Sequence, residues 1–427
     1  MHPVEVAATA RRAQRAWILY DVGNSAFATT VMAVVLPVYF ASVAGRDLPD
    51  GQPTALWGYA TTIAMLLSAV SAPLMGALAD AQARRRHWLG LFALAGAVLT
   101  TGFALVGPGD WVLALALYIA ARLAFANSVV MYDSLLPHVT APEDMDAVSA
   151  RGFGFGYLGG GLLLALQLVV ITKPALFGIP EGTWATRLVF ASTGVWWALF
   201  TIPILRTVRE RVSEGVGSAL QGATSPMREA FSRLWKTFHE LRRHRQAMTF
   251  LIAFWLYNDG IGTIVSMAAI FAEEIGLERT QTMIALLVVQ FLGFPFSLLF
   301  GRLARHIGAR NAIAVGLVGY TMICIGAWFV RTEVHFFALA VGVSMFQGGC
   351  QALSRSLFAS MIPAERSSEF FGFYNISSKF ASLLGPLILS TVALITGDAR
   401  LGVIALVVLF VGGLAVLMRV RPEEALA

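Results

Sequence analysis

The stretch GALADAQARRR (residues 76–86) is a small-residue and charged segment between two long apolar runs. A related stretch, GRLARHIGAR (residues 301–310), follows a later apolar run of similar length. A segment that recurs at a corresponding place in each half of a chain is evidence for an internal structural repeat. We therefore expect two halves of the same architecture, each built around the apolar runs that flank its copy of the segment.

The composition points to a membrane rather than to water as the surroundings of the chain. Of its 427 residues, 57% are hydrophobic and 13% are charged, whereas a soluble domain carries about 25% charged residues. Apolar runs that approach or exceed the ~20 residues of a membrane-crossing helix recur along the chain. Because every backbone amide in lipid must be satisfied within its own segment, we expect all-α structure. Twelve transmembrane helices are predicted, near 17–43, 55–79, 88–106, 111–137, 152–172, 187–205, 247–272, 281–300, 311–330, 335–362, 370–395 and 400–418.

The loops predict the orientation and the domain boundaries. Loops on one side of the membrane hold 22 of the 31 Lys and Arg residues, and loops on the other side hold 6. Cytoplasmic loops are enriched in positive charge, so the richer side, which carries both termini, is expected to be cytoplasmic. The longest loop, 206–246, separates six-helix halves at 1–205 and 247–427. Apolar residues at helical spacing after Ser225 and Pro226 predict an amphipathic helix in this loop, acting as a tether or as a regulatory element.

Two six-span halves in parallel register resemble the major facilitator fold, whose substrate site lies between the halves near the midplane. The first loop segment is similar to that family's Gly-x-Leu-Ala-Asp-x-x-Gly-Arg-Arg signature at Gly76, Asp80, Arg84 and Arg85, with Ala83 where glycine is usual. The resemblance implies a cytoplasmic gating motif whose charge network makes and breaks as helix ends move. The alternative is a simple positive-inside stop signal.

A narrower resemblance lies in the first and fourth spans. The stretches YDVGNSAF (residues 20–27), LPVYF (36–40) and YDSLLP (132–137) look like the signatures of the unknown major facilitator family. Relatives in that family include the autophagy-linked vacuolar amino-acid effluxers. The resemblance implies a permease, such as an exporter of amino acids or similar solutes, and does not fix the substrate.

Charged side chains inside the spans are the first candidates for a site, since each costs at least ~2.5–3.5 kcal/mol to insert. Asp259 lies near mid-depth of the seventh span. We expect it to bind substrate or a proton together with its neighbours Tyr257 and Asn258. The alternative is a structural ion pair with Arg122 or Lys379.

The first and fourth spans carry further candidates. Arg122 and Asp133 lie 11 residues apart, on nearly the same helical face but too far apart to touch. Asp21 and Asn24 belong to the first-span signature. We expect Asp21 to act in gating or coupling, near either Arg122 or Asp133; the alternative is local solvation at the start of the helix.

The tenth and eleventh spans carry polar stripes. Gln347, Gln351 and Arg355 are spaced i, i+4 and i+8, and Asn375 and Lys379 are spaced i, i+4, so each set shares one helical face. We expect these faces to line a cavity or to form a cytoplasmic gate.

The intramembrane cations suggest a substrate class. Arg122, Arg355 and Lys379 together would suit an anionic group, such as the carboxylate of an amino acid or a small acid. Gln167 and Gln290 are isolated in their spans, and buried amides of that kind commonly join helices by hydrogen bonds.

Several other functions are not expected. The basic residues lie in short clusters between apolar runs, which argues against nucleic-acid binding. The scattered histidines predict no metal site, and Cys324 and Cys350 are expected to be packing residues. The stretch GFGYLG (154–159) mimics a dinucleotide-binding fingerprint but lacks a preceding strand, so it predicts close helix packing and no cofactor. A nucleophile with a base, as an enzyme would need, is also not expected.

The sequence thus predicts a secondary transporter that moves a small organic solute by alternating access, with protons as a candidate coupling ion. A lipid or lysolipid flippase and a membrane sensor without transport are the alternatives. The expected partners are the solute, protons and the lipid bilayer, and the expected state is a monomer. The high alanine and arginine content suggests a bacterial cytoplasmic membrane.

Overall fold

The computed structural model describes residues 3–49, 51–180, 182–210, 244–274, 279–380 and 384–424, and every regular element within these ranges is helical. The expected amphipathic helix of the central loop falls on residues 211–243, outside the described ranges. Cys324 and Cys350 are free and buried, which confirms that they act as packing residues.

The first half of the chain is a bundle of long helices. Its first helix, α1 (Pro3–Ala26), continues through the π-helical turns η1 (Phe27–Val34) and η2 (Phe40–Ala44), with the short α2 (Val35–Tyr39) between them. The remaining elements are α3 (Gln52–Gln82), α4 (Arg85–Gly102), η3 (Phe103–Leu105), α5 (Trp111–Ser134), α6 (Leu136–Val139), η4 (Pro142–Asp144), α7 (Met145–Thr172), η5 (Pro174–Phe177) and α8 (Trp184–Thr207).

The second half repeats the pattern. Its elements are α10 (Arg245–Glu274), α11 (Arg279–Ile307), α12 (Ala309–Gly326), η6 (Ala327–Phe329), α13 (Glu333–Ser360), η7 (Ala364–Arg366), α14 (Ser367–Phe380), α15 (Leu384–Thr396), α16 (Ala399–Ala405), α17 (Val407–Leu417) and η8 (Pro422–Glu424).

Within the described residues, eleven helical segments are long and apolar enough to cross a membrane. They correspond to all the predicted spans except the eleventh, 370–395, which the structure describes as α14 and the shorter apolar α15 on either side of residues 381–383. Many helices extend past the apolar run that predicted them; α11, for example, covers 279–307 where 281–300 was expected.

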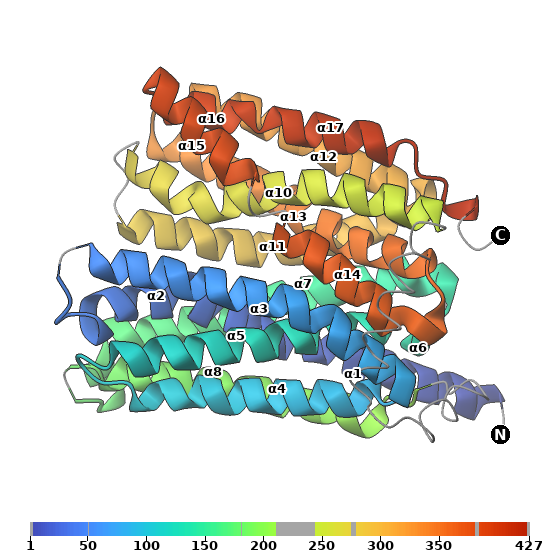
Figure 1. Cartoon of the computed structure of the whole chain (residues 1–427), viewed down its shortest axis with the longest axis horizontal. Helices are drawn as coiled ribbons and strands as arrows, with labels where there is room; N and C mark the ends of the chain where they lie inside the picture. Colours follow the sequence, from blue (N-terminus) through green and yellow to red (C-terminus); the bar gives the residue numbers. More distant parts are fainter. Residues whose placement is uncertain are drawn as a thin grey trace.

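The two halves lie side by side as two layers of helices (Figure 1). The first half is drawn in blue and green, and the second half, drawn in yellow to red, packs against it. Across the boundary, α7 packs on α11 and α13, and α14 packs on α3 and α5. The beginning of α1 and the end of α17 lie at the same, right-hand end of the bundle in Figure 1. We call this the terminal end and the opposite one the distal end.

Glycines allow α7 to approach its neighbours closely. A Cβ atom at Gly156 or Gly159 would overlap α1, and one at Gly154 would lie 3.2 Å from the carbonyl oxygen of Phe294 in α11. The glycine-rich stretch therefore fits α7 between the two halves, which confirms close helix packing as its role. Gly76 and Gly301, the first residues of the two repeated segments, likewise face the opposite half.

Candidate functional site

Arg355, in the last turns of α13, joins the two halves near the terminal end. Its guanidinium Nη1 lies 3.1 Å from Oδ1 of Asp133 and 3.5 Å from Oδ2 of Asp21. Its Nε donates to Oγ of Ser149 at 2.9 Å, and its Nη2 donates to the Ser149 carbonyl at 3.0 Å. Every one of these partners belongs to the first half of the chain, so a single side chain of the second half is held by α1, α5 and α7.

Aromatic rings enclose the same guanidinium. Its carbon lies 4.4 Å from the ring centre of Phe153, 4.6 Å from that of Trp17 and 5.3 Å from that of Tyr132. The Tyr132 hydroxyl donates to Asp21 at 3.0 Å. Cations over aromatic faces are attracted more strongly when they are desolvated, and Arg355 is only 3% exposed. We call Arg355, Asp21 and Asp133 the inter-half charge cluster.

The repeated loop segment makes a second contact between the halves. Asp80, at the end of α3, accepts hydrogen bonds from the backbone N–H groups of Glu369 at 2.8 Å and Ser368 at 3.3 Å. These N–H groups belong to the first turn of α14, where a carboxylate is favourable. Arg85 donates to Asp80 at 2.7 Å and lies 3.6 Å from Glu210. Asp80 and Arg85 are both buried, whereas Arg84 is exposed.

Backbone geometry explains two residues of this segment. A Cβ atom at Gly76 would overlap the carbonyl oxygen of Ser368, so only glycine permits this approach of α3 to α14. In the second copy, a Cβ at Gly301 would lie 2.6 Å from that of Ala150 in α7. Ala83 takes φ +49°, a left-handed conformation that suits glycine, which is the usual residue at this place in the signature.

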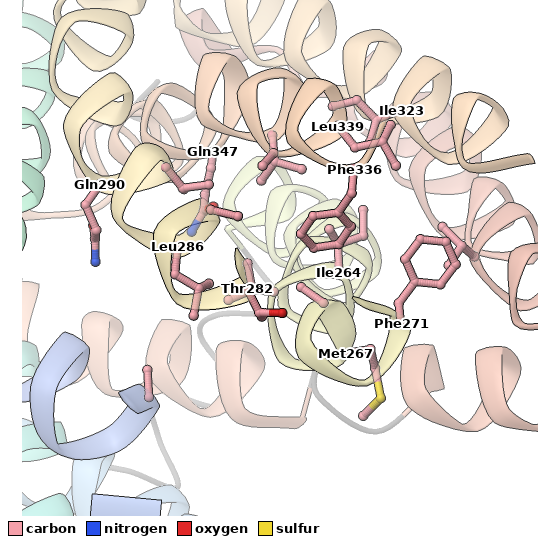
Figure 2. A pocket seen from close by; sticks show the side chains of 18 of the residues that line it. Ile264, Met267, Phe271, Thr282, Leu286, Gln290, Ile323, Phe336, Leu339 and Gln347 are labelled. Carbon is pink, nitrogen blue, oxygen red and sulfur yellow. The ribbon is translucent and has the colours of Figure 1, made fainter. Parts of the chain in front are cut away.

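A cavity of about 180 Å³ lies between the halves, on the distal side of the charge cluster. It is lined mainly by α10, α11 and α13, with contributions from α7 and η1. In Figure 2, Gln290 and Gln347 lie at one end of the cavity, and Phe271 and Phe336 at the other. Among the described residues that line it, none is Asp, Glu, Lys, Arg or His.

Asp259 contacts backbone rather than a cation. Its carboxylate accepts from the N–H groups of Leu384 and Gly385, each at 3.0 Å, and is buried. It therefore holds the first turn of α15, just past residues 381–383. In the described part of the chain its partners are these amides and not Arg122, the ion pair considered from the sequence.

The remaining predicted residues are spread over several contacts. Arg122 is half-buried, and its guanidinium donates to the Tyr118 hydroxyl and lies over that ring. The Tyr257 hydroxyl is 2.6 Å from Oγ of Ser354. Of the other polar candidates, Gln347 lines the cavity, Asn24 and Asn375 are buried, and Asn258 and Gln351 are half-buried.

Two of the three cations of the predicted anion site have partners in this conformation. Arg355 is bound by two carboxylates and Arg122 by Tyr118. Lys379 belongs to α14, and its side chain is outside the described part of the structure.

Comparison with known proteins agrees with this architecture. Residues 52–426 match the family model described as "Vacuole effluxer Atg22 like". The chain is 36% identical over 413 residues to the uncharacterized MFS-type transporter YxiO of Bacillus subtilis, covering 96% of this chain and 95% of that protein. The chain belongs to the Atg22-like family. It is therefore a multi-pass membrane transporter of the major facilitator superfamily.

More distant Atg22-like relatives and solved structures extend the comparison. Autophagy-related protein 22 of Yarrowia lipolytica is 24% identical over 453 residues, which cover 86% of this chain and 75% of that protein. The proton:xylose symporter XylE has a TM-score of 0.70 at 12% identity, covering 97% of this chain and 95% of that one. The human organic anion transporter MFSD10 has a TM-score of 0.67 at 16% identity, with 98% and 100% covered. At these identities the two structures establish the fold alone.

The sequence did not single out several residues of this Atg22-like site. Ser149 and Phe153 of α7 and Trp17 of α1 surround Arg355. Ser149 and Phe153 are one helical turn apart, but no spacing along the chain relates them to Trp17 or to Arg355. Gln290 was expected to join helices, as Gln167 does through its hydrogen bonds to Thr30 and Thr193. Gln290 instead lines the cavity, and its side-chain oxygen has no partner among the described residues.

Proposed function

We propose that the protein is a secondary transporter that moves a small organic solute through the cavity between its halves by alternating access. Two groups of contacts close the terminal end: the inter-half charge cluster, and the contacts of Asp80 and Arg85 with α14. The cavity lies distal to both. The observation that carries the proposal is Arg355, because a buried guanidinium held only by the opposite half must be released before the terminal end can open.

The proposal includes the topology expected from the sequence. The halves are 1–205 and 247–427, joined by the linker 206–246. We take α14 and α15 together as one crossing, which makes twelve, and we place the terminal end in the cytoplasm. The excess of positive charge in the loops at that end supports this orientation. The residence of the protein in a bacterial cytoplasmic membrane, as a monomer, is part of the same proposal.

Protons are the proposed coupling ion. In the closed state one guanidinium faces two carboxylates, Asp21 and Asp133. When Arg355 leaves, two negative charges remain together in an apolar interior, which is costly unless a proton neutralises one of them. Asp259 is the third candidate carrier, since a proton on its carboxylate would weaken its hold on α15.

The substrate class has two candidates. An amino acid or similar carboxylate-bearing solute requires that Arg355, Arg122 or Lys379 faces the cavity in another state of the cycle. A lysolipid is the second candidate, because the cavity lining is mainly apolar. A sensor that does not transport is the remaining alternative.

Transport into proteoliposomes separates these possibilities. We expect counterflow of at least one solute from a panel of amino acids, organic acids and neutral aromatic compounds, with faster uptake under a pH gradient. Arg355→Gln should change the rate of counterflow, because it shifts the balance between the closed and open states of the terminal end. Arg331→Gln, which changes an exposed arginine at the distal end, should not. Movement of fluorescent lysolipid instead of any soluble solute would favour the flippase, and no movement of either would favour the sensor.

The same assay assigns the proton. Asp21→Asn, Asp133→Asn and Asp259→Asn are compared for the ratio of uptake with and without the pH gradient. The variant that retains counterflow but loses the gradient effect identifies the carrier. An unchanged ratio in Asp259→Asn would remove that residue as the carrier, and an unchanged ratio in all three would contradict proton coupling through them.

A further inference from the structure

We infer that the cavity takes an uncharged solute with an apolar, ring-sized body and a hydrogen-bond donor, and that Gln290 and Gln347 are its specificity-determining residues. This assignment rests on the proposed transport function and sets a neutral substrate class in place of the carboxylate-bearing solute and the lysolipid considered above.

Among the described residues, the lining carries no fixed ion. Thr29, Tyr157, Thr282, Gln290 and Gln347 are the polar residues among those described around the cavity, and the others are apolar. A carboxylate or ammonium group in such surroundings would lose its hydration without gaining a partner of opposite charge. A neutral solute avoids that cost.

The volume sets the size of the solute. The cavity measures about 180 Å³, and a dry cavity of roughly 150 Å³ is large enough to bind benzene. An aromatic ring or a branched aliphatic group with one small polar substituent therefore fits this conformation, whereas a lysolipid with its headgroup and acyl chain does not.

The two glutamines supply the polar contacts. The side-chain oxygens of Gln290 and Gln347 are buried and have no hydrogen-bond partner among the described residues. A buried acceptor without a donor costs about 1–3 kcal/mol, so a solute that brings an N–H or O–H group would relieve that cost. Figure 2 shows the side chains of Gln290 and Gln347 at the same end of the cavity, so the polar substituent of the solute would be directed to this end.

Tyr157 connects this end of the cavity to the boundary between the halves. Its ring, carried by α7, lies against Gly293 of α11 and Gly348 of α13, where a Cβ would come within 3.1 and 2.8 Å of it. Tyr157 lines the cavity together with Gln347. Gln347 and Arg355 lie on one face of α13, about 12 Å apart along the helix. A solute bound to Gln347 is thus placed on the helix that carries the charge cluster.

Binding of three nearly isosteric benzene derivatives tests the assignment. Benzamide is neutral with N–H donors, methyl benzoate is neutral without a donor, and benzoate is an anion. We expect isothermal titration of the full-length protein in nanodiscs, corrected with empty nanodiscs, to rank benzamide first. Methyl benzoate should bind about tenfold more weakly, because it leaves the glutamine oxygens unpaired, and benzoate at least about a hundredfold more weakly.

Variants locate the site. Gln347→Leu should weaken benzamide about tenfold and leave methyl benzoate unchanged. The matched control is Gln351→Leu, one turn further along α13 and outside the cavity lining, which should leave both unchanged. The thermal unfolding midpoint of each variant verifies that it is folded. Equal binding of benzamide and methyl benzoate, tighter binding of benzoate, or equal effects of the two variants would each overturn the assignment.

The outcome is separable from that of the transport assay. If benzamide binding depends on Gln347 but no solute shows counterflow, the binding site is supported and the transport function is refuted. If anionic solutes show counterflow and benzamide does not inhibit it, the transport function is supported and the neutral substrate class is refuted.

Discussion

Replacement of Arg355 by glutamine should shift the protein from closed to open at the terminal end. The substitution removes the cation and leaves Asp21 and Asp133 facing each other, both buried in the closed state. It also removes the donors to Ser149. In an open state the same carboxylates would be hydrated. The substitution therefore destabilises mainly the closed conformation.

The magnitude follows from the burial of the cluster. Removal of one partner from a buried ion pair costs about 3–5 kcal/mol. We take about 3 kcal/mol of this cost to act on the closed state and not on the open one. The ratio of closed to open molecules then falls roughly a hundredfold, since each 1.4 kcal/mol is tenfold. A wild type that is about 99% closed would then become about evenly populated.

Distances between spin labels measure this shift. One label pair, His87→Cys and Arg305→Cys, spans the halves at the terminal end, and a second, Gln52→Cys and Val334→Cys, spans them at the distal end. All four positions are exposed. The buried native cysteines, Cys324 and Cys350, are replaced by alanine in the parent protein.

We expect Arg355→Gln to lengthen the terminal-end distance and shorten the distal-end distance, as a change between two folded states requires. The triple variant Asp21→Asn, Asp133→Asn, Arg355→Gln should recover much of the closed population, because removal of all three charges avoids an unpaired buried ion. Distances in Arg355→Gln that match those of the wild type at both ends would refute the gating role of the cluster.

Three further predictions concern local geometry. Ala83→Gly should raise the free energy of unfolding by about 1 kcal/mol, since it relieves a left-handed alanine; an unchanged or lower thermal midpoint in detergent would contradict this. Gly76→Val should reduce counterflow at least about tenfold by separating α3 from α14, whereas Gly58→Ala, with nothing within 4 Å of the added Cβ, should not; equal activities would show that the close approach is dispensable. Asp259→Asn should lower stability by about 1–3 kcal/mol, because an amide oxygen and an amide nitrogen cannot both accept from the N–H groups of α15; a wild-type midpoint in the denaturation curve would argue against the capping role.

Most of the helical architecture was predictable from the sequence. A helix that crosses lipid needs a long apolar run, and such runs are visible one segment at a time without knowledge of their neighbours. The repeated loop segment also predicted that Gly76 and Gly301 occupy corresponding places in the two halves, and each of them does pack against the opposite half. The region around 370–395 was less predictable, because the first turn of α15 is held by Asp259 from another helix.

The sequence also identified Asp21, Asp133 and Arg355 as candidates, because an ionisable side chain in an apolar run is costly wherever it points. It could not show that the three meet, since they come from α1, α5 and α13, and their contact depends on how those helices pack. For the same reason it could not show that Arg355 is held by two carboxylates and Arg122 by Tyr118.

The sequence by itself determined that the chain is a repeated, membrane-embedded helical bundle with a few charges inside it, because hydrophobicity and insertion cost are properties of single segments. Only the tertiary structure decided which of those charges neutralise one another and that the described side chains around the cavity beside them are uncharged. Ion pairing and the cavity lining both depend on side chains from different helices. The number of residues between two such side chains in the sequence does not determine the distance between them in space.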